Sequence, residues 1–158
     1  MNYILSFFSK GKEGGKDSFT GIKDVDAEIL LKLDNRSFIR TCSLNNYFMD
    51  LCEENDGLLF KRKLQLFYPD TIQYAIQYKD GSWKNYYASV IKTIALLHEE
   101  YKFNYTRENP FIQLDILSKW GGTPEFVVLE AARLEQISLI EYMFRKDPRL
   151  MQYFSRIN

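Results

Sequence analysis

The chain has 158 residues, and its 21 basic residues balance its 21 acidic ones, so its formal net charge is zero. With that balance, the chain as a whole offers no field that would concentrate a nucleic acid or an anionic membrane. Its apolar runs all fall short of the roughly 20 residues that cross a bilayer. We therefore expect neither a nucleic acid nor a membrane as a partner, and the length fits one domain or a small module fused to a second.

Residues 1–23 are predicted to be an N-terminal segment followed by a flexible linker. The opening MNYILSFF is apolar but lacks a basic start and a small-residue cleavage site, so it does not match a signal peptide and we expect the protein not to be secreted. The stretch SKGKEGGKDSFTG, which is rich in Gly, Ser and Lys, is typical of a connector. Its glycines lack the spacing of a phosphate-binding loop.

Residues 24–69 predict a cluster of three short helices. Their apolar residues recur at i, i+3 and i+4, which indicates amphipathic helices. Asp34 and Asn45 stand where helices should restart, and both types are good N-caps because their side chains accept from free amides of the first turn. The pair Asn55 and Gly57 predicts a break in the third helix, and Pro69 ends it. The run Lys61–Lys63 is interpreted as part of a solvated helix face.

The two cysteines, Cys42 and Cys52, lie on apolar faces of these predicted helices. The chain contains no CxxC motif and only one histidine, His98, so it predicts no zinc site built from Cys and His. A disulfide between the two cysteines is possible. Because both lie on apolar helix faces, we interpret them instead as small buried hydrophobic residues in a reducing compartment.

Residues 70–158 predict a helical C-terminal half that continues the same fold. The segment 71–78 alternates apolar and polar residues and predicts a short extended stretch, for which residues 1–8 could be the pairing partner. The longest helix signal runs over 82–101, with Ser82 as its cap and a wide apolar stripe, and we expect this helix to tie both halves together.

Residues 109–156 predict helical hairpins with recognisable start signals. Asn109-Pro110 and Thr123-Pro124 each place a capping side chain before a proline, which loses no hydrogen bond in the first turn. Ser138 and Glu141 match a capping box. The expected fold class is therefore mainly α, a compact multi-helix domain with at most a short extended segment or a two-stranded element.

The sequence offers no credible active site. His98 is followed by Glu99 and Glu100 on a charged helix surface, and no Ser or Cys lies near it in the chain. Adjacent carboxylates such as Glu53 and Glu54 diverge on a helix instead of converging on one substrate. We predict a protein that is not an enzyme, with no catalytic residue, no bound cofactor and no metal.

The helical cluster of residues 24–69 contains, in chain order, the apolar residues Ile29, Leu30, Leu31, Leu33, Cys42, Phe48, Leu51, Phe60 and Leu64. In their order and approximate spacing these residues resemble the F-box, in the divergent form found in F-box-like proteins of large DNA viruses that infect amoebae. The chain departs from the motif at Val25-Asp26, which replaces Leu-Pro, and at Phe60, which replaces Trp. The resemblance implies that this protein acts as an adaptor in the host cytoplasm or the virion. It would bind a second protein, a Skp-type adaptor, and through it recruit a ubiquitin-ligase scaffold. The expected contact residues, provided that they are exposed, are Val25, Ile29, Leu30 and Phe38.

The segment 129–144 has a helix-turn-helix pattern, which is carried by Ala131, Ala132, Ile137, Leu139, Ile140 and Met143. This pattern is similar to a single degenerate ankyrin repeat, with Glu135 where the family usually has a turn glycine. Any helical hairpin produces a similar pattern, and one repeat cannot bury its own face.

An alternative function of the whole protein stays open. It would be a structural or virion-packaged protein, in contact with virion proteins or with its own copies, whose F-box-like helices are only core. Exposure of those helices distinguishes the two functions.

Overall fold

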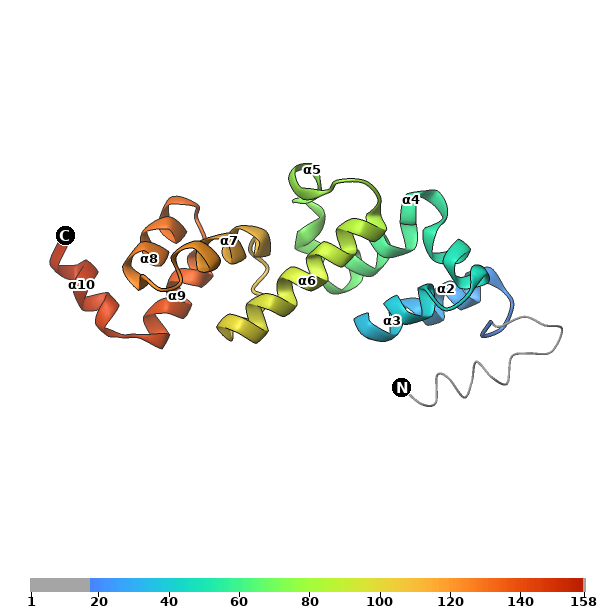
Figure 1. The fold of residues 1–158 in the computed structure, drawn as a ribbon, viewed down its shortest axis with the longest axis horizontal. Coiled ribbons are helices and arrows are strands. Elements are labelled where there is room, and N and C mark those ends of the chain that lie inside the picture. Colours follow the sequence, from blue (N-terminus) through green and yellow to red (C-terminus); the bar gives the residue numbers. More distant parts are fainter. Residues whose placement is uncertain (1–17, 158) are drawn as a thin grey trace. The chain divides into compact units, whose positions relative to one another are not determined.

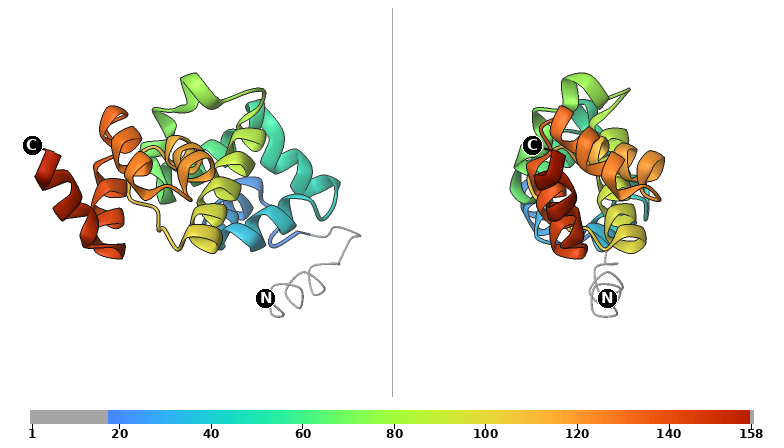
Figure 2. Two further views of the ribbon diagram at one scale, coloured as in Figure 1. Left: turned by 60° about the vertical axis from the view of Figure 1, so that its left-hand side comes forward. Right: turned by 90° about the vertical axis from the view of Figure 1, so that its left-hand side faces the viewer.

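A computed structural model describes residues 18–157, and all regular structure within them is helical (Figure 1). This confirms the mainly α fold class. The helices are α2 (Lys23–Leu31), α3 (Asn35–Cys42), α4 (Asn46–Phe67), the 3-10 helix η2 (Pro69–Ile72), α5 (Ala75–Tyr78), α6 (Trp83–Tyr101), α7 (Pro110–Trp120), α8 (Pro124–Arg133), α9 (Ile137–Lys146) and α10 (Arg149–Ile157). Figure 2 shows the same helices in two further views.

The chain divides into two compact units, Met1–Tyr87 and Ala88–Asn158. The division falls inside α6, whose first residues belong to the first unit and whose remaining residues belong to the second. Tyr87 is fully buried in the first unit, and Leu97 is fully buried in the core of the second. The long helix predicted over 82–101 is therefore present and contributes side chains to both units.

The core of the first unit is built from aromatic rings on α3, α4 and α6. The Phe38 ring meets the Phe60 ring edge-on with their centroids 5.2 Å apart, and it meets the Tyr87 ring at 5.4 Å. Pairs of this kind add about 0.5–1.5 kcal/mol beyond the burial of their area. Leu30 on α2 and Phe48 on α4 are fully buried as well. The apolar periodicity of residues 24–69 therefore marks a real three-helix core.

Three of the predicted helix starts are confirmed by their capping hydrogen bonds, whereas Thr123, the predicted cap of α8, makes no side-chain capping bond. The Asp34 carboxylate accepts from the Ser37 amide at 2.8 Å, and the Asn45 side chain accepts from the Phe48 amide at 3.0 Å. The hydroxyl of Ser82 accepts from the Asn85 amide at 3.2 Å. These caps act within three residues of sequence, which is why the sequence alone indicates them.

The predicted break in α4 is also confirmed. Asn55, Asp56 and Gly57 have φ values of 53°, 60° and 79°, so three consecutive residues adopt the left-handed conformation inside α4. Gly57 suits this place for a second reason, because an added Cβ would lie 3.0 Å from the backbone nitrogen of Lys84. The kink thus brings the start of α6 against the backbone of α4.

The extended stretch predicted over 71–78 is wrong. It forms the end of η2 followed by α5, and its Tyr74 amide donates to the Thr71 carbonyl at 3.3 Å. A lone strand needs a neighbour to satisfy its backbone, whereas helical turns satisfy it locally. Ile76 is 98% exposed, so the alternation does not mark a buried face. The proposed pairing partner, residues 1–8, lies outside the described residues.

The cysteines are paired, which corrects their interpretation as unpaired residues. Cys42, at the end of α3, forms a disulfide with Cys52 in α4, and the two Cα atoms are 5.7 Å apart. This separation is ordinary for a disulfide. Both residues are buried, as their apolar helix faces predicted. The sequence could not decide between pairing and simple burial because both place sulfur in the core.

The second unit contains the predicted hairpin of α8 and α9, joined by a three-residue turn. Glu135 in this turn has a φ of 58°, and the Gln136 amide donates to the Ala131 carbonyl at 2.8 Å. That bond and the left-handed residue before it are those of a Schellman motif. The core around the hairpin consists of Leu97, Phe103, Ile116, Leu117, Val127, Val128, Ala131, Leu139, Met143 and Leu150.

The capping box predicted for Ser138 and Glu141 is wrong. The helix α9 begins at Ile137, so Ser138 already lies inside its first turn. The cap comes instead from Glu108, whose carboxylate accepts from the Ile137 amide at 3.0 Å and from the Ser138 amide at 2.6 Å. A carboxylate is favourable at a helix N-terminus because it meets free amides and the positive end of the dipole. The cap is thus supplied from about 30 residues away in sequence.

Candidate functional site

The structure separates the four residues expected to contact a partner. Val25 is 42% exposed and Ile29 is partly exposed, whereas Leu30 and Phe38 are fully buried. The condition of exposure is therefore met by Val25, met in part by Ile29 and not met by the other two. Leu30 and Phe38 hold the three-helix core together and present no surface.

The period of α2 explains this separation. Its buried residues are Asp26, Leu30 and Leu31, which fall on one side of the helix. At 3.6 residues per turn, Val25 and Ile29 lie four residues apart on another side, and Ile22 precedes them by three. Ile22, just before the helix, is 60% exposed. We call the set of Ile22, Val25 and Ile29, at positions i, i+3 and i+7, the α2 stripe.

The α2 stripe stands on a helix that a buried carboxylate holds in place. The carboxylate of Asp26, which is fully buried, accepts from the Thr20 amide at 2.8 Å and from the Thr20 hydroxyl at 2.6 Å. It also accepts from the Gly21 amide at 3.2 Å and from the hydroxyl of Tyr47 on α4. Burial, followed by the bond to Asp26, raises the pKa of Tyr47. Four donors satisfy the buried charge, as its burial requires.

This role of Asp26 is not predicted above, where the residue is only a departure from the F-box motif. The signal that could have found it is an acidic residue on the face of α2 that otherwise carries Leu30. The bond from Tyr47 could not be predicted, because Tyr47 is 21 residues further along the chain.

Lys63 is a second buried charge near α2. Its ammonium donates to the Leu31 carbonyl at 2.8 Å and to the Leu33 carbonyl, so it caps the C-terminal end of the helix. It also lies 4.1 Å from the centroid of the Phe67 ring. Burial lowers the pKa of Lys63 from 10.5 to about 8, against the opposing effect of the Asp34 carboxylate. The interpretation of Lys61–Lys63 as a solvated face is therefore wrong for Lys63.

The other side of α2 faces a small hollow against α4. Its volume is about 100 Å³, which is below the roughly 300–1,000 Å³ of small-molecule pockets. Ion pairs connect the two helices there: Arg62 lies 2.7 Å from Glu28, and Lys23 lies 4.0 Å from Glu54. These pairs are exposed, so each contributes at most about 1 kcal/mol. The hollow is too small for a ligand of that kind, and the α2 stripe is the better candidate site.

Three further features of residues 18–157 concern the grouping of possible metal ligands, the surroundings of His98 and the length of the apolar helices. Between residues 18 and 157, no three His, Cys, Asp or Glu side chains are arranged to hold a metal ion. His98 is exposed, and its Nδ1 atom lies 2.8 Å from the Oδ1 atom of Asn104. Among the helices of this described part, none is both long and apolar enough to span a membrane.

Comparison with known proteins finds no match to this chain among family models, curated proteins or solved structures. The candidate site therefore depends on the exposure and spacing of its own residues. Val25 and Ile29 lie about one turn apart on α2 and Ile22 stands at its N-cap; Ile22 and Val25 are exposed and Ile29 is partly exposed, while Leu30, on the same helix, is fully buried.

Proposed function

We propose that this protein is a non-enzymatic protein–protein interaction module that docks through the α2 stripe. The observation that carries the proposal is the row of Ile22, just before α2, and Val25 and Ile29 on it: the first two are exposed and the third is partly exposed, while Leu30 and Leu31 on the same helix are core. Single exposed apolar residues are normal on any protein. A row at i, i+3 and i+7 is the pattern by which one helix places anchors in the apolar groove of a partner.

The partner we propose is a Skp-type adaptor of a host ubiquitin ligase, which makes the protein an F-box-like adaptor acting in the cytoplasm of an amoebal host. Support comes from the resemblance of residues 24–69 to the F-box and from the place of the stripe. Val25 stands at the hydrophobic position that opens the motif, and it is exposed. Leu30 and Phe38 then serve as the scaffold that presents it.

A second candidate is a structural or virion-packaged protein that binds virion proteins or its own copies. The burial of Leu30 and Phe38, together with the disulfide between α3 and α4, favours this candidate. Both features suit helices whose main purpose is to form a stable core.

The two candidates are distinguished by recovering partners of the tagged full chain from amoebal lysate and identifying them by mass spectrometry. The test variant is Val25→Asp, which places a charge in the middle of the α2 stripe. The matched control is Ile76→Asp, because Ile76 on α5 is 98% exposed and lies outside the stripe. We expect the wild type and the control to recover a Skp-type adaptor with its cullin, and the Val25 variant to lose both while keeping its thermal unfolding midpoint.

Recovery of only the chain itself or of virion proteins would reject the ligase function and favour the structural candidate. Recovery of the adaptor by the Val25 variant as well as by the wild type would reject the α2 stripe as the contact surface.

A further inference from the structure

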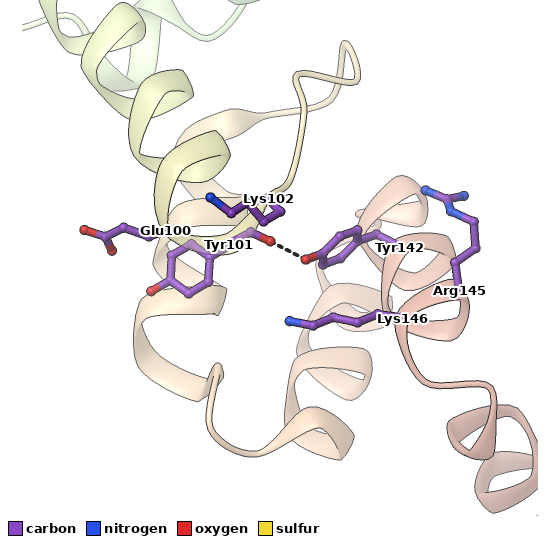
Figure 3. A pocket seen from close by; sticks show the side chains of 6 residues that line it. All are labelled: Glu100, Tyr101, Lys102, Tyr142, Arg145 and Lys146. Carbon is purple, nitrogen blue, oxygen red and sulfur yellow. Dashed lines mark hydrogen bonds between the residues drawn. The ribbon is translucent and has the colours of Figure 1, made fainter.

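A hollow of about 410 Å³ lies in the second unit, beside the C-terminal ends of α6 and α9 (Figure 3). Its cations are accounted for by those helix ends. The Lys102 ammonium donates to the Glu99 carbonyl at 3.2 Å, and the Lys146 ammonium lies 5.7 Å from the centroid of an aromatic ring on α9. The hollow is thus explained without a ligand, and the feature that calls for a further explanation lies in the first unit, at the kink of α4.

The kink of α4 consists of residues 54–57, which interrupt an otherwise continuous helix. One extended residue is followed by three left-handed ones, of which Asn55 and Asp56 carry a Cβ atom. Asn and Asp adopt this conformation more readily than other residues with a Cβ atom, but as a rule singly. The apolar stripe of α4 nevertheless stays in phase across the kink, because the buried Cys52 and Leu59 are seven residues, or about two helical turns, apart. The apolar pattern of α4 is therefore that of one straight helix.

The residues before the kink are held together by contacts of their own. The disulfide between Cys42 and Cys52 joins α3 to the first part of α4. The hydroxyl of Tyr47, in the same part of α4, donates to the carboxylate of Asp26 on α2. We call residues 18–53 the N-terminal lobe. Because the disulfide closes inside this lobe, the lobe can turn as one piece about the kink without breaking it.

The N-terminal lobe joins residues 58–87 through well-matched contacts. The Asn35 amide donates to the Tyr68 hydroxyl at 3.0 Å and accepts from the Tyr87 hydroxyl at 2.7 Å. The other partners across this boundary are Phe38 with Phe60 and Tyr87, Lys63 with Leu31 and Leu33, and Arg62 with Glu28. None of these contacts requires that both partners belong to one chain. A second copy of the chain offers the same partners in the same geometry.

We propose that two copies of this chain exchange their N-terminal lobes when α4 straightens at the kink. Each lobe then packs on residues 58–87 of the other copy, and Asn55 and Asp56 leave the left-handed region. Short connections under strain favour such an exchange. Two terms oppose it, since association costs entropy and Gly57 suits the kink better than a straight helix. The balance therefore depends on concentration.

The test measures the self-association of the full chain after refolding from urea at low and at high concentration, with the disulfide intact, by size-exclusion chromatography with light scattering. We expect a dimer at high concentration. Asn55→Ala/Asp56→Ala should lower the dissociation constant of this dimer about tenfold or more, because alanine disfavours the left-handed region and favours a straight helix in both chains.

The matched control is Asp50→Ala/Gln65→Ala, which also removes one carboxylate and one amide from exposed positions of α4. Both positions are helical on either side of the kink, so the control should change the dissociation constant less than about threefold. A second variant, Asn55→Gly/Asp56→Gly, should raise this constant about tenfold, because glycine accepts the left-handed region and weakens a straight helix. It replaces the alanine variant if that variant does not keep the thermal midpoint of the wild type.

Exchange is distinguished from any other dimer by refolding a mixture of ¹³C-labelled and unlabelled chains and recording isotope-filtered NOEs. We expect a contact between the Phe38 ring of one chain and the Phe60 ring of the other. A dimer in which this contact stays within each chain would overturn the proposal. So would equal effects of the alanine variant and its control, or monomers at every concentration in both the wild type and the alanine variant. The result is independent of whether the α2 stripe binds a partner.

Discussion

Lys63 couples the stability of the first unit to pH in the alkaline range. Burial lowers its pKa from 10.5 to about 8, so between these values the unfolded chain binds more protons than the folded chain. Stability therefore rises with pH across this window, by about 2 kcal/mol from pH 7.5 to 9.5. Burial raises the pKa of Tyr47, Tyr86 and Tyr87 above the ordinary value of 10, so these groups stay protonated throughout the window.

The measurement is urea unfolding of the wild type and of Lys63→Met at both pH values, followed by signals of Phe38 and Leu64. The wild type should gain stability with pH relative to the variant, in which this group is absent. Equal changes in both proteins would show that Lys63 keeps an ordinary pKa, and hence that its ammonium is hydrated and not buried against the carbonyls of α2.

Residue roles that act over a few positions could be predicted from sequence, and those that act over long separations could not. Asp34 and Asn45 were identified as caps because each accepts from an amide three residues ahead. Lys63 and Glu108 satisfy carbonyls or amides in the same way, yet their partners are about 30 residues away, and the bond between Asp26 and Tyr47 spans 21 residues. A buried charge is satisfied by whatever the fold brings near, and the sequence does not show that.

At the scale of elements, the turn between α8 and α9 contains a strained residue. Glu135 has a φ of 58°, where a residue with a Cβ atom is disfavoured and glycine is not. Glu135→Gly should therefore stabilise the second unit by about 0.5–1 kcal/mol. A matched control is Ala132→Gly, which places glycine inside α8 at an exposed position and should destabilise by about 1 kcal/mol. Urea unfolding followed by signals of Val127 and Leu139 measures both.

If both glycine variants destabilise the unit equally, the left-handed conformation of Glu135 would not be the relevant feature of the turn. The side chain would then stabilise the turn by more than its strain costs. The opposite signs that we expect would show that the position favours glycine. That outcome would describe the turn alone and would not identify a repeat family, because any Schellman turn favours glycine at its left-handed position.

Helices were predictable because their apolar residues repeat at 3.6, and the one wrong element shows the limit of this signal. Over 71–78 the alternation of tyrosine and isoleucine suggested a strand, but the chain forms η2 and α5. The candidate site shows the same limit. Ile29 and Leu30 are neighbours of similar hydrophobicity, and only the direction in which α2 packs leaves the first partly exposed and buries the second.

At the scale of the molecule, the two units have separate cores and one helix in common. Phe38, Phe60 and Tyr87 bring their rings together in the first unit, and Leu97 lies in the apolar cluster of the second. The only cysteines, Cys42 and Cys52, both belong to the first. A change at the disulfide should therefore act on one core directly and leave the contacts of the other in place.

Reduction of the Cys42–Cys52 disulfide is expected to destabilise the first unit selectively. By the chain-entropy estimate, a closed loop of this length, with a sequence separation of 10, contributes about 2.5–3 kcal/mol. Amide hydrogen exchange of the oxidised and reduced protein measures the effect unit by unit. Exchange at Phe48 and Leu51 should accelerate about a hundredfold on reduction, whereas exchange at Ala131 and Met143 should change less than about threefold.

Equal acceleration in both units would mean that they open as one cooperative body despite their separate cores. No acceleration anywhere would mean that the packing of α3 on α4 holds the sulfur atoms together without the bond. The double variant Cys42→Ala/Cys52→Ala, measured without reductant, separates the loss of the bond from effects of the reducing agent.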